Sequence, residues 1–242
     1  MMSFSLQFVL VLIGTFVIAL VLTPLVRLFS FKIDAVDYPN ARRINTKPMP
    51  SAGGLSIVIA FSIATLIFIP MLTSTTAPIK SYLSYTLPVV GAGWIIALTG
   101  LIDDVKELSA KKKMIGILLA ASLVWFLTDF RLNDFKIPFG GPLLHFEPWL
   151  SYLLTVIWIV AITNAVNLID GLDGLVSGVS IISLVTMGIV SYFFLPVPNL
   201  FLTMTIFVLV ASIAGFFPFN YHPAILYLGD TGALFIGFMI SV

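Results

Sequence analysis

The stretch FSLQFVLVLIGTFVIALVLTPLVRLF, residues 4–29, decides the fold class of this chain. A membrane-spanning helix needs about 20 predominantly apolar residues, and this stretch is longer than that. It also exceeds the apolar core of a signal peptide, and no basic segment precedes it. We therefore interpret it as a retained transmembrane helix.

Apolar stretches of similar length follow one another along the chain, separated by short polar segments. They lie at about 53–72, 83–102, 114–130, 149–166, 175–195 and 200–217, and an eighth begins near Gly232. Hydrophobic residues make up 60% of the 242 residues and charged residues only 10%, whereas soluble domains carry roughly 25% charged residues. The sequence predicts an all-α fold, a polytopic transmembrane helix bundle of about eight helices that forms a single domain over residues 1–242.

The composition also limits the partners and the chemistry. The net charge is only +1 and the basic residues are scattered, so nucleic acid is not expected as a partner. The expected partners are lipids of the bilayer and small anions. The chain has no cysteine, which excludes disulfides, thiolate metal sites and cysteine nucleophiles. Carboxylates, imidazoles and amides must therefore do any chemistry.

Lysine and arginine predict the orientation of the bundle, because short loops rich in them stay in the cytoplasm. If successive helices alternate in direction, nine of the twelve fall on one side, which we predict to be cytoplasmic, with the N-terminus external. The nine are Arg27, Lys32, Arg42, Arg43, Lys47, Lys106, Lys111, Lys112 and Lys113, against Lys80, Arg131 and Lys136. Eight acidic residues fall on the same side, which the rule does not require: Asp34, Asp37, Asp103, Asp104, Glu107, Asp170, Asp173 and Asp230.

The first polar motif is GLIDDVKE, residues 100–107. The adjacent carboxylates of Asp103 and Asp104 repel each other unless a cation or a proton lies between them. The pair therefore suits a divalent metal or a general base with a raised pKa. A solvated helix end, balanced by the lysines that follow, explains the motif about equally well.

The second motif, NAVNLIDGLDGL at residues 164–175, is the most specific signal in the chain. In a helix, Asn164, Asn167 and Asp170 would share one face, and Asp173 would continue it or enter a loop. Their oxygens and amides suit metals, sugars, bases and phosphates. Because one aspartate at mid-bilayer costs about 2.5 to 3.5 kcal/mol, a purely structural turn is the weaker interpretation.

Two further motifs have a structural explanation beside the functional one. In YLGDTG, residues 227–232, Asp230 lies between glycines before a helix start, where it could hold a metal or cap the helix. The segment FNYHPA at 219–224 precedes it, and we assign its His222 no metal role. The loop DYPNARRINTKPMPSAGG at 37–54 could meet phosphates through its basic residues. Its composition alone favours membrane anchoring.

Together and in this order, the four motifs resemble the polyprenyl-phosphate N-acetylhexosamine-1-phosphate transferases of glycosyltransferase family 4. The resemblance runs from about residue 4 to the end of the chain. Asp103, Asp104 and Glu107 form an Asp-Asp-x-x-acidic pattern that is similar to the UDP-N-acetylglucosamine branch, including the initiators of teichoic acid and of the O-antigen of lipopolysaccharide. The branch that uses UDP-N-acetylmuramoyl-pentapeptide usually has lysine at the fifth place.

The resemblance implies a catalytic domain that transfers sugar-1-phosphate from a UDP-N-acetylhexosamine to undecaprenyl phosphate and releases UMP. This would be the first membrane step of cell-wall glycopolymer synthesis, at the cytoplasmic face of the plasma membrane. Magnesium is the implied cofactor, with manganese as a substitute, and a homodimer is compatible with the family. The implied catalytic residues are Asp103, Asp104 and Asp170, the metal ligands Asp230 and Asp170, and the substrate-binding residues Lys47, Ser51, Asn164, Asn167, Asp173, Asn220 and Tyr227.

The chain departs from the family pattern at three places. Asn45 replaces a common histidine, Ala233 replaces a serine, and the family's later histidine-containing loop and last helices are absent, so we expect this chain to be a C-terminally truncated fragment that is inactive alone. An ion- or proton-coupled transporter is the alternative from another class, but its carboxylates should lie near helix centres. An inactive assembly subunit would leave the motifs unexplained.

Overall fold

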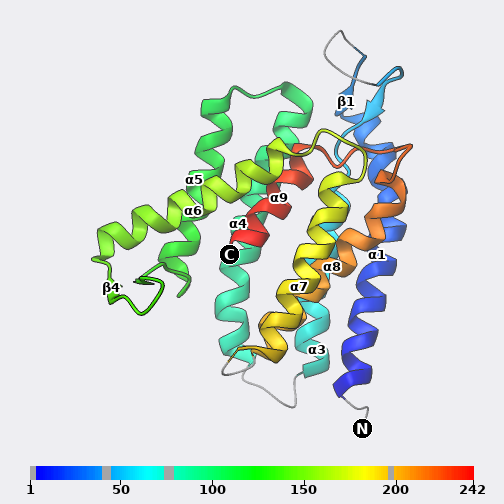
Figure 1. The fold of residues 1–242 in the computed structure, drawn as a ribbon. Helices are drawn as coiled ribbons and strands as arrows, with labels where there is room; N and C mark the ends of the chain where they lie inside the picture. The colour runs from blue at the N-terminus through cyan, green and yellow to red at the C-terminus, as the bar shows by residue number, and fades with distance from the viewer. Residues whose placement is uncertain (1–3, 40–44, 74–78, 196–198) are drawn as a thin grey trace.

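A computed structural model describes residues 4–39, 45–73, 79–195 and 199–242 (Figure 1). Arg42 and Arg43, which the orientation argument used, lie outside these residues. The helices in chain order are α1 (Phe4–Lys32), α2 (Gly54–Ile63), α3 (Ile69–Thr73), α4 (Ile79–Lys106), α5 (Ala110–Leu127), α6 (Pro148–Leu168), α7 (Leu175–Phe193), α8 (Leu200–Asn220) and α9 (Gly229–Ser241). A five-residue π-helical segment, η1 (Ala64–Phe68), joins α2 to α3.

The eight predicted apolar stretches coincide with these helices, because α2, η1 and α3 follow each other end to end as one span. Six helical segments of the described chain are long and apolar enough to cross a membrane, at 6–32, 54–71, 82–106, 148–168, 175–193 and 200–220. Two helices fall outside this group. The 18-residue α5 carries three lysines directly after its first residue, and α9 has only 13 residues. The prediction of an all-α polytopic bundle is confirmed.

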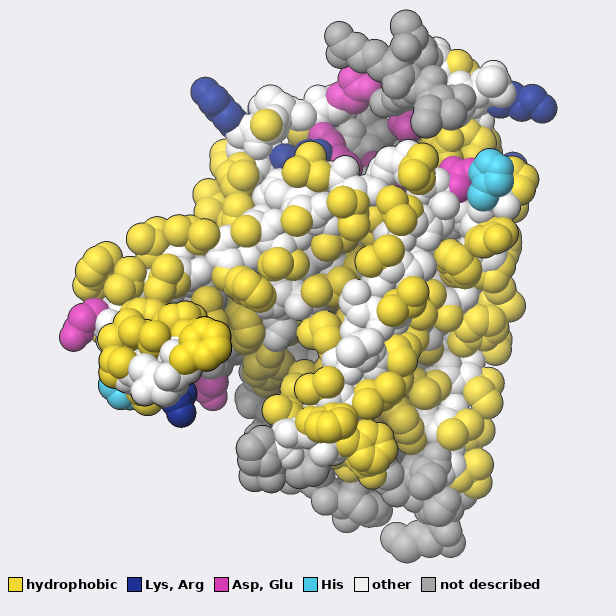
Figure 2. Space-filling view, in the orientation of Figure 1, with side chains coloured by type: hydrophobic (Ala, Val, Ile, Leu, Met, Phe, Trp, Pro, Cys, Tyr) yellow, Lys and Arg dark blue, Asp and Glu magenta, His cyan; other side chains and the backbone are white. Residues whose placement is uncertain are grey.

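The short helix α9 lies at the centre of the bundle. It packs against α4, α6 and α2, and the seven residues from Gly232 to Phe238 are all buried. By contrast, apolar side chains of α1 such as Val21, Leu25 and Leu28 are exposed. Hydrophobic side chains cover the flanks of the molecule in Figure 2, and charged ones gather at its upper end. This distribution is that of a protein with lipid around its sides.

Glycines allow the central helices to touch backbone to backbone. A side chain on Gly54 of α2 would overlap the backbone of Gly232 in α9, and one on Gly100 of α4 would overlap the backbone of Asp230. Gly229, at the start of α9, has φ +70° and lies against the carbonyl oxygen of Ser51. Only glycine adopts this backbone conformation without strain.

Two small strand pairs were not predicted. β1 (Val36–Asp37) pairs antiparallel with β2 (Met49–Pro50) in the loop between α1 and α2. β3 (Asp134–Lys136) pairs antiparallel with β4 (Leu143–His145) in the connection from α5 to α6. The first pair lies at the end of the bundle where α9 begins, and the second lies beside the start of α6, away from that end (Figure 1).

Candidate active site

The polar motifs meet at one end of the bundle, the upper end in Figure 1. The last turn of α4, the start of α5, the loop after α6 and the start of α9 lie together there. Each motif follows or precedes a helix whose apolar residues fix its position in the membrane, so the helix ends bring distant parts of the sequence to one surface.

Asp104 joins the end of α4 to the start of α9. Its carboxylate accepts hydrogen bonds from the backbone N–H of Asp230 (2.8 Å) and Thr231 (3.1 Å) and from the Thr231 hydroxyl (2.6 Å). The first N–H groups of a helix have no partner within the helix, so a carboxylate from another helix satisfies them and complements the helix dipole. Asp104 is therefore held in place as a cap of α9.

Asp103, the neighbour of Asp104, belongs to a different set of contacts. Its carboxylate lies 2.6 Å from the ammonium of Lys113 and accepts a hydrogen bond from the Leu108 N–H at 2.5 Å. Lys113 also forms an ion pair with Asp230, and the amide of Asn167 donates to the other Asp230 oxygen at 2.6 Å. We call Asp103, Lys113, Asn167 and Asp230 the aspartate–lysine cluster.

Asp170 lies next to this cluster, in the loop after α6, and is half-buried. Burial raises its pKa to about 7, and the negative charges of Asp230 and Asp37 add to the increase. Among the described residues, the carboxylates of Asp103, Asp170 and Asp230 thus lie near one half-buried ammonium, that of Lys113. The excess of negative charge favours a further cation.

The donors suit a hard divalent cation such as magnesium, which prefers carboxylate and amide oxygens. Asp230, Asp103, Asp170 and the amide oxygen of Asn167 are groups of this kind. In the described residues, however, no three histidine, aspartate or glutamate side chains already converge as a metal-binding group. Lys113 lies between Asp103 and Asp230, where a shared cation would lie. These oxygen donors fit a magnesium ion once the Lys113 ammonium has moved aside.

The predicted helical face of the second motif extends less far than expected. Helix α6 ends at Leu168, so Asn164 and Asn167 are helical while Asp170 and Asp173 follow in the loop. Asn167 reaches Asp230, whereas the Asn164 amide donates to the carbonyl of Val160 one turn earlier at 2.8 Å. The face ends because the helix ends before Asp170, and the loop that follows contains Gly171 and Gly174, of which Gly174 has φ +71° and precedes the first residue of α7.

Asp173 and Asn220 bind parts of the protein itself. The Asp173 carboxylate accepts hydrogen bonds from His222 Nδ1 and the Ala224 N–H, both at 3.0 Å. Asn220 is buried; it accepts from the Ser177 hydroxyl at 2.8 Å and donates to the Leu226 carbonyl at 3.3 Å. These contacts fasten the segment between α8 and α9 to α7 and to the loop before it.

The remaining predicted residues come from the loops around the start of α9. Ser51 is buried, and its hydroxyl has no hydrogen-bond partner among the described residues. The Tyr227 N–H donates to the Pro50 carbonyl at 2.9 Å, which holds the two loops together. Lys47 is exposed at the surface.

Sequence reasoning missed two residues at this site. Lys113 is the last of three consecutive lysines, and the other two, Lys111 and Lys112, are exposed. Thr231 donates its hydroxyl to Asp104. A helix that starts at Ala110 places only one lysine of the three toward α9, so the helix start was the signal that could have identified Lys113.

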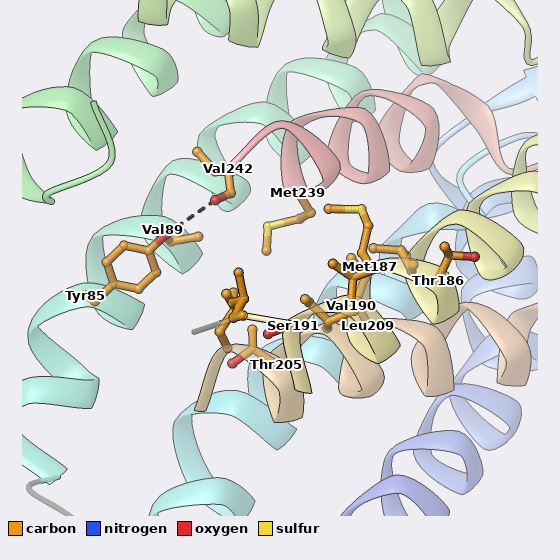
Figure 3. A pocket seen from close by; sticks show the side chains of 14 residues that line it. Tyr85, Val89, Thr186, Met187, Val190, Ser191, Thr205, Leu209, Met239 and Val242 are labelled. Atoms are coloured by element: carbon orange, nitrogen blue, oxygen red, sulfur yellow. Dashed lines mark hydrogen bonds between the residues drawn. The ribbon is translucent and has the colours of Figure 1, made fainter. Parts of the chain in front are cut away.

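A separate cavity of about 370 Å³ lies between α4, α7, α8 and α9 (Figure 3). Its lining is almost entirely apolar and includes Val89, Met187, Leu209 and Met239. The Tyr85 hydroxyl at its edge donates to the carbonyl of Val242 at 3.4 Å. No aspartate of the described chain lines this cavity, so it does not belong to the aspartate–lysine cluster.

Comparison with known proteins places this bundle and its aspartate–lysine cluster in a known family. The sequence profile of Glycosyl transferase family 4 matches residues 86–242, and the chain belongs to this family. It is 38% identical to a probable undecaprenyl-phosphate N-acetylglucosaminyl 1-phosphate transferase of Bacillus subtilis, over 92% of the chain and 58% of that protein.

Two other relatives show how far the similarity extends within the family. A decaprenyl-phosphate N-acetylglucosaminephosphotransferase of Mycolicibacterium smegmatis is 32% identical over 89% of the chain and 54% of its own length. A phospho-N-acetylmuramoyl-pentapeptide-transferase of Staphylococcus saprophyticus is 34% identical over 95% of the chain and 72% of its own length. The chain thus spans little more than half of the first two relatives, and its similarity reaches both branches of the family.

Proposed function

We propose that the protein transfers N-acetylglucosamine-1-phosphate from a UDP-sugar to undecaprenyl phosphate at the cytoplasmic face of the cell membrane, with release of UMP. One observation carries this proposal. Asp103 and Lys113, Asn167 and Asp230 come from three parts of the sequence, and direct contacts join them at one end of the bundle. Both substrates are phosphate anions and one is a lipid, so a charged cluster at a helix end suits them.

In the proposed reaction, a phosphate oxygen of the lipid attacks the phosphorus that carries the sugar. A new phosphorus–oxygen bond forms while the bond from that phosphorus to the bridging oxygen breaks. The bridging oxygen leaves with UMP, and the product is a lipid diphosphate sugar. Phosphoryl transfer of this kind depends on positioning and on neutralising negative charge.

Asp230, Asp103 and Asp170 would hold magnesium, which would neutralise the charge of the diphosphate. Asn167 orients the Asp230 carboxylate through its hydrogen bond. Lys113 would turn its ammonium from the carboxylates toward a phosphate oxygen. Asp104 keeps the first turn of α9 in register with α4, so we assign it a positioning role in place of the base role that its motif suggested.

The donor sugar is proposed on the sequence pattern and the relatives. Glu107 stands where the pentapeptide branch usually has lysine, and two of the relatives above have N-acetylglucosamine in their names. Because a pentapeptide transferase is also among the relatives, UDP-N-acetylmuramoyl-pentapeptide is the alternative donor. A transporter is less well supported, because Asp103 and Asp230 lie in the last turn of α4 and the first turn of α9, away from helix centres.

The test is a transfer assay on the protein expressed from its whole natural coding sequence. It is incubated with undecaprenyl phosphate, magnesium and labelled UDP-N-acetylglucosamine, in parallel with UDP-N-acetylmuramoyl-pentapeptide. Label in the lipid from the first donor alone supports the proposal, and label from the second alone assigns the other branch. No transfer from any UDP-sugar would refute the enzyme function.

A further inference from the structure

The hairpin of β3 and β4 has two chemically different faces. Because side chains alternate along a strand and Phe135 pairs with Leu144, these two lie on the same face. The Ile137 N–H donates to the Pro142 carbonyl at 3.2 Å, which extends the apolar face by one more pair. The opposite face carries Asp134, which forms an ion pair with His145, and Lys136 opposite Leu143.

The apolar face and the tip of this hairpin are not covered by the rest of the described chain. Phe135 is 52% exposed, Leu144 is 43% exposed, and Phe139 at the tip is fully exposed. Trp149, at the start of α6, is 67% exposed. In Figure 2 hydrophobic side chains gather over this part of the molecule, and charged ones lie along its margin. Exposed apolar groups of this size in one place indicate a surface that binds something apolar.

The length of α5 indicates that this apolar partner is the lipid bilayer. The helix has 18 residues, of which the first four are Ala110 and three lysines. The remaining 14 extend about 21 Å at 1.5 Å per residue, whereas the hydrocarbon core is about 30 Å thick. Since α5 enters the membrane at the end that carries the aspartate–lysine cluster, it ends before it has crossed a bilayer of ordinary thickness.

Polar groups follow immediately where α5 ends. Thr128, Asp129 and Arg131 line a polar cavity of about 300 Å³ together with Ser84 and Tyr85 from the first turns of α4. The Arg131 guanidinium also lies over the ring of Trp125, 4.7 Å from its centre. Tryptophan is enriched at the boundary between hydrocarbon and water, and arginine near the end of a helix extends its charged group to the same boundary. The polar surface of the bilayer must therefore meet the protein at this level, beside the hairpin.

We propose that the β3–β4 hairpin is a membrane-surface anchor in the leaflet opposite the aspartate–lysine cluster. The side chains of Phe135, Phe139 and Leu144 insert into the edge of the hydrocarbon, while Asp134 and Lys136 remain in water. The apolar face thereby lies against the hydrocarbon that α5 is too short to reach. A short helix is accommodated by local thinning of the bilayer, and the hairpin stabilises this thinned region.

The absence of native cysteine allows a direct test. A nitroxide label is attached to single variants Phe135→Cys, Phe139→Cys and Leu144→Cys, with Asp134→Cys and Lys136→Cys as matched controls on the other face. The protein is reconstituted into phosphatidylcholine–phosphatidylglycerol vesicles. Collision of each label with oxygen, which concentrates in lipid, is compared with collision with a water-soluble nickel chelate.

We expect the ratio of oxygen to nickel collision to be severalfold higher at positions 135, 139 and 144 than at 134 and 136. Equal access of nickel to all five labels would overturn the proposal, because the hairpin would then lie in water. Labels at 135, 139 and 144 that are shielded from both reagents would also overturn it. In that case a second copy of the chain or another protein covers the apolar face.

Discussion

The two ends of the bundle hold their charged groups in opposite ways. At the aspartate–lysine cluster, contacts join residues far apart in sequence, such as Asn167 and Asp230, and the groups are partly buried. In the β3–β4 hairpin, Asp134 and His145 pair across two neighbouring strands, and both are exposed. Partly buried charges are costly and contribute little to stability unless they are well paired. The convergence of several such groups from distant segments supports the catalytic role proposed for this end.

The largest effect should come from Asp230→Asn, which tests whether the first end is catalytic. The variant removes a charge opposite Lys113 and a proposed metal ligand, so transfer to lipid should fall by about 10²- to 10³-fold. The fold should persist, because Asp104 accepts from the backbone of residue 230 and not from its side chain. Full magnesium-dependent turnover in this variant would refute the metal assignment.

Asp104→Ala tests whether the same end also depends on its cap. The substitution leaves two N–H groups and the Thr231 hydroxyl without their acceptor, which should lower the free energy of unfolding by roughly 2–3 kcal/mol. Thermal unfolding in detergent measures the loss. Asp104→Asn keeps one acceptor oxygen and serves as the control, with a smaller decrease. If the two variants and the native protein unfold at the same temperature, the capping role is wrong.

Lys113→Gln separates the ammonium from the carboxylates that it bridges. If Lys113 and magnesium compete for Asp103 and Asp230, the variant should bind magnesium more tightly, and the rise in melting temperature that magnesium causes should appear at a severalfold lower concentration. Lys112→Gln is the matched control, because Lys112 is exposed and its removal should change nothing. Weaker magnesium stabilisation in the Lys113 variant than in its control would contradict the competition.

The smallest effect should come from Asp134→Asn at the other end. Exposed ion pairs contribute less than about 1 kcal/mol, so the melting temperature and the rate of transfer to lipid should both stay near those of the native protein. A large loss of transfer would show that the two ends are coupled, which would invalidate the contrast between them.

Much of the fold could be predicted because each transmembrane helix is a long apolar stretch. The strand pairs could not, since two or three residues such as Val36–Asp37 carry no periodic signal. The convergence of Asp103, Asp104 and Asp230 could be predicted from the alternation of helix directions. Their separate roles could not, because adjacent aspartates at a helix end point in different directions, toward α5 and toward α9.

Lys113 is a second case in which the sequence does not show which side chain makes the contact. Three consecutive lysines satisfy the positive-inside rule equally well, and only the rotation of α5 distinguishes the one that faces the carboxylates. Likewise, the spacing of Asn164, Asn167 and Asp170 predicted one helical face, but the helix ends at Leu168. Patterns in sequence predicted which segments meet, and the helix boundaries decided which side chains touch.

The contacts of Gly54 with Gly232 and of Gly100 with Asp230 bear on how this protein can change shape. At these two points the main chains lie against each other with no side chain between them, which resists sliding of α2 and α4 along the start of α9. A working cycle therefore runs around a fixed frame. In the proposed reaction, entry of the lipid phosphate and departure of the nucleotide would then be accommodated by the segments that connect these helices.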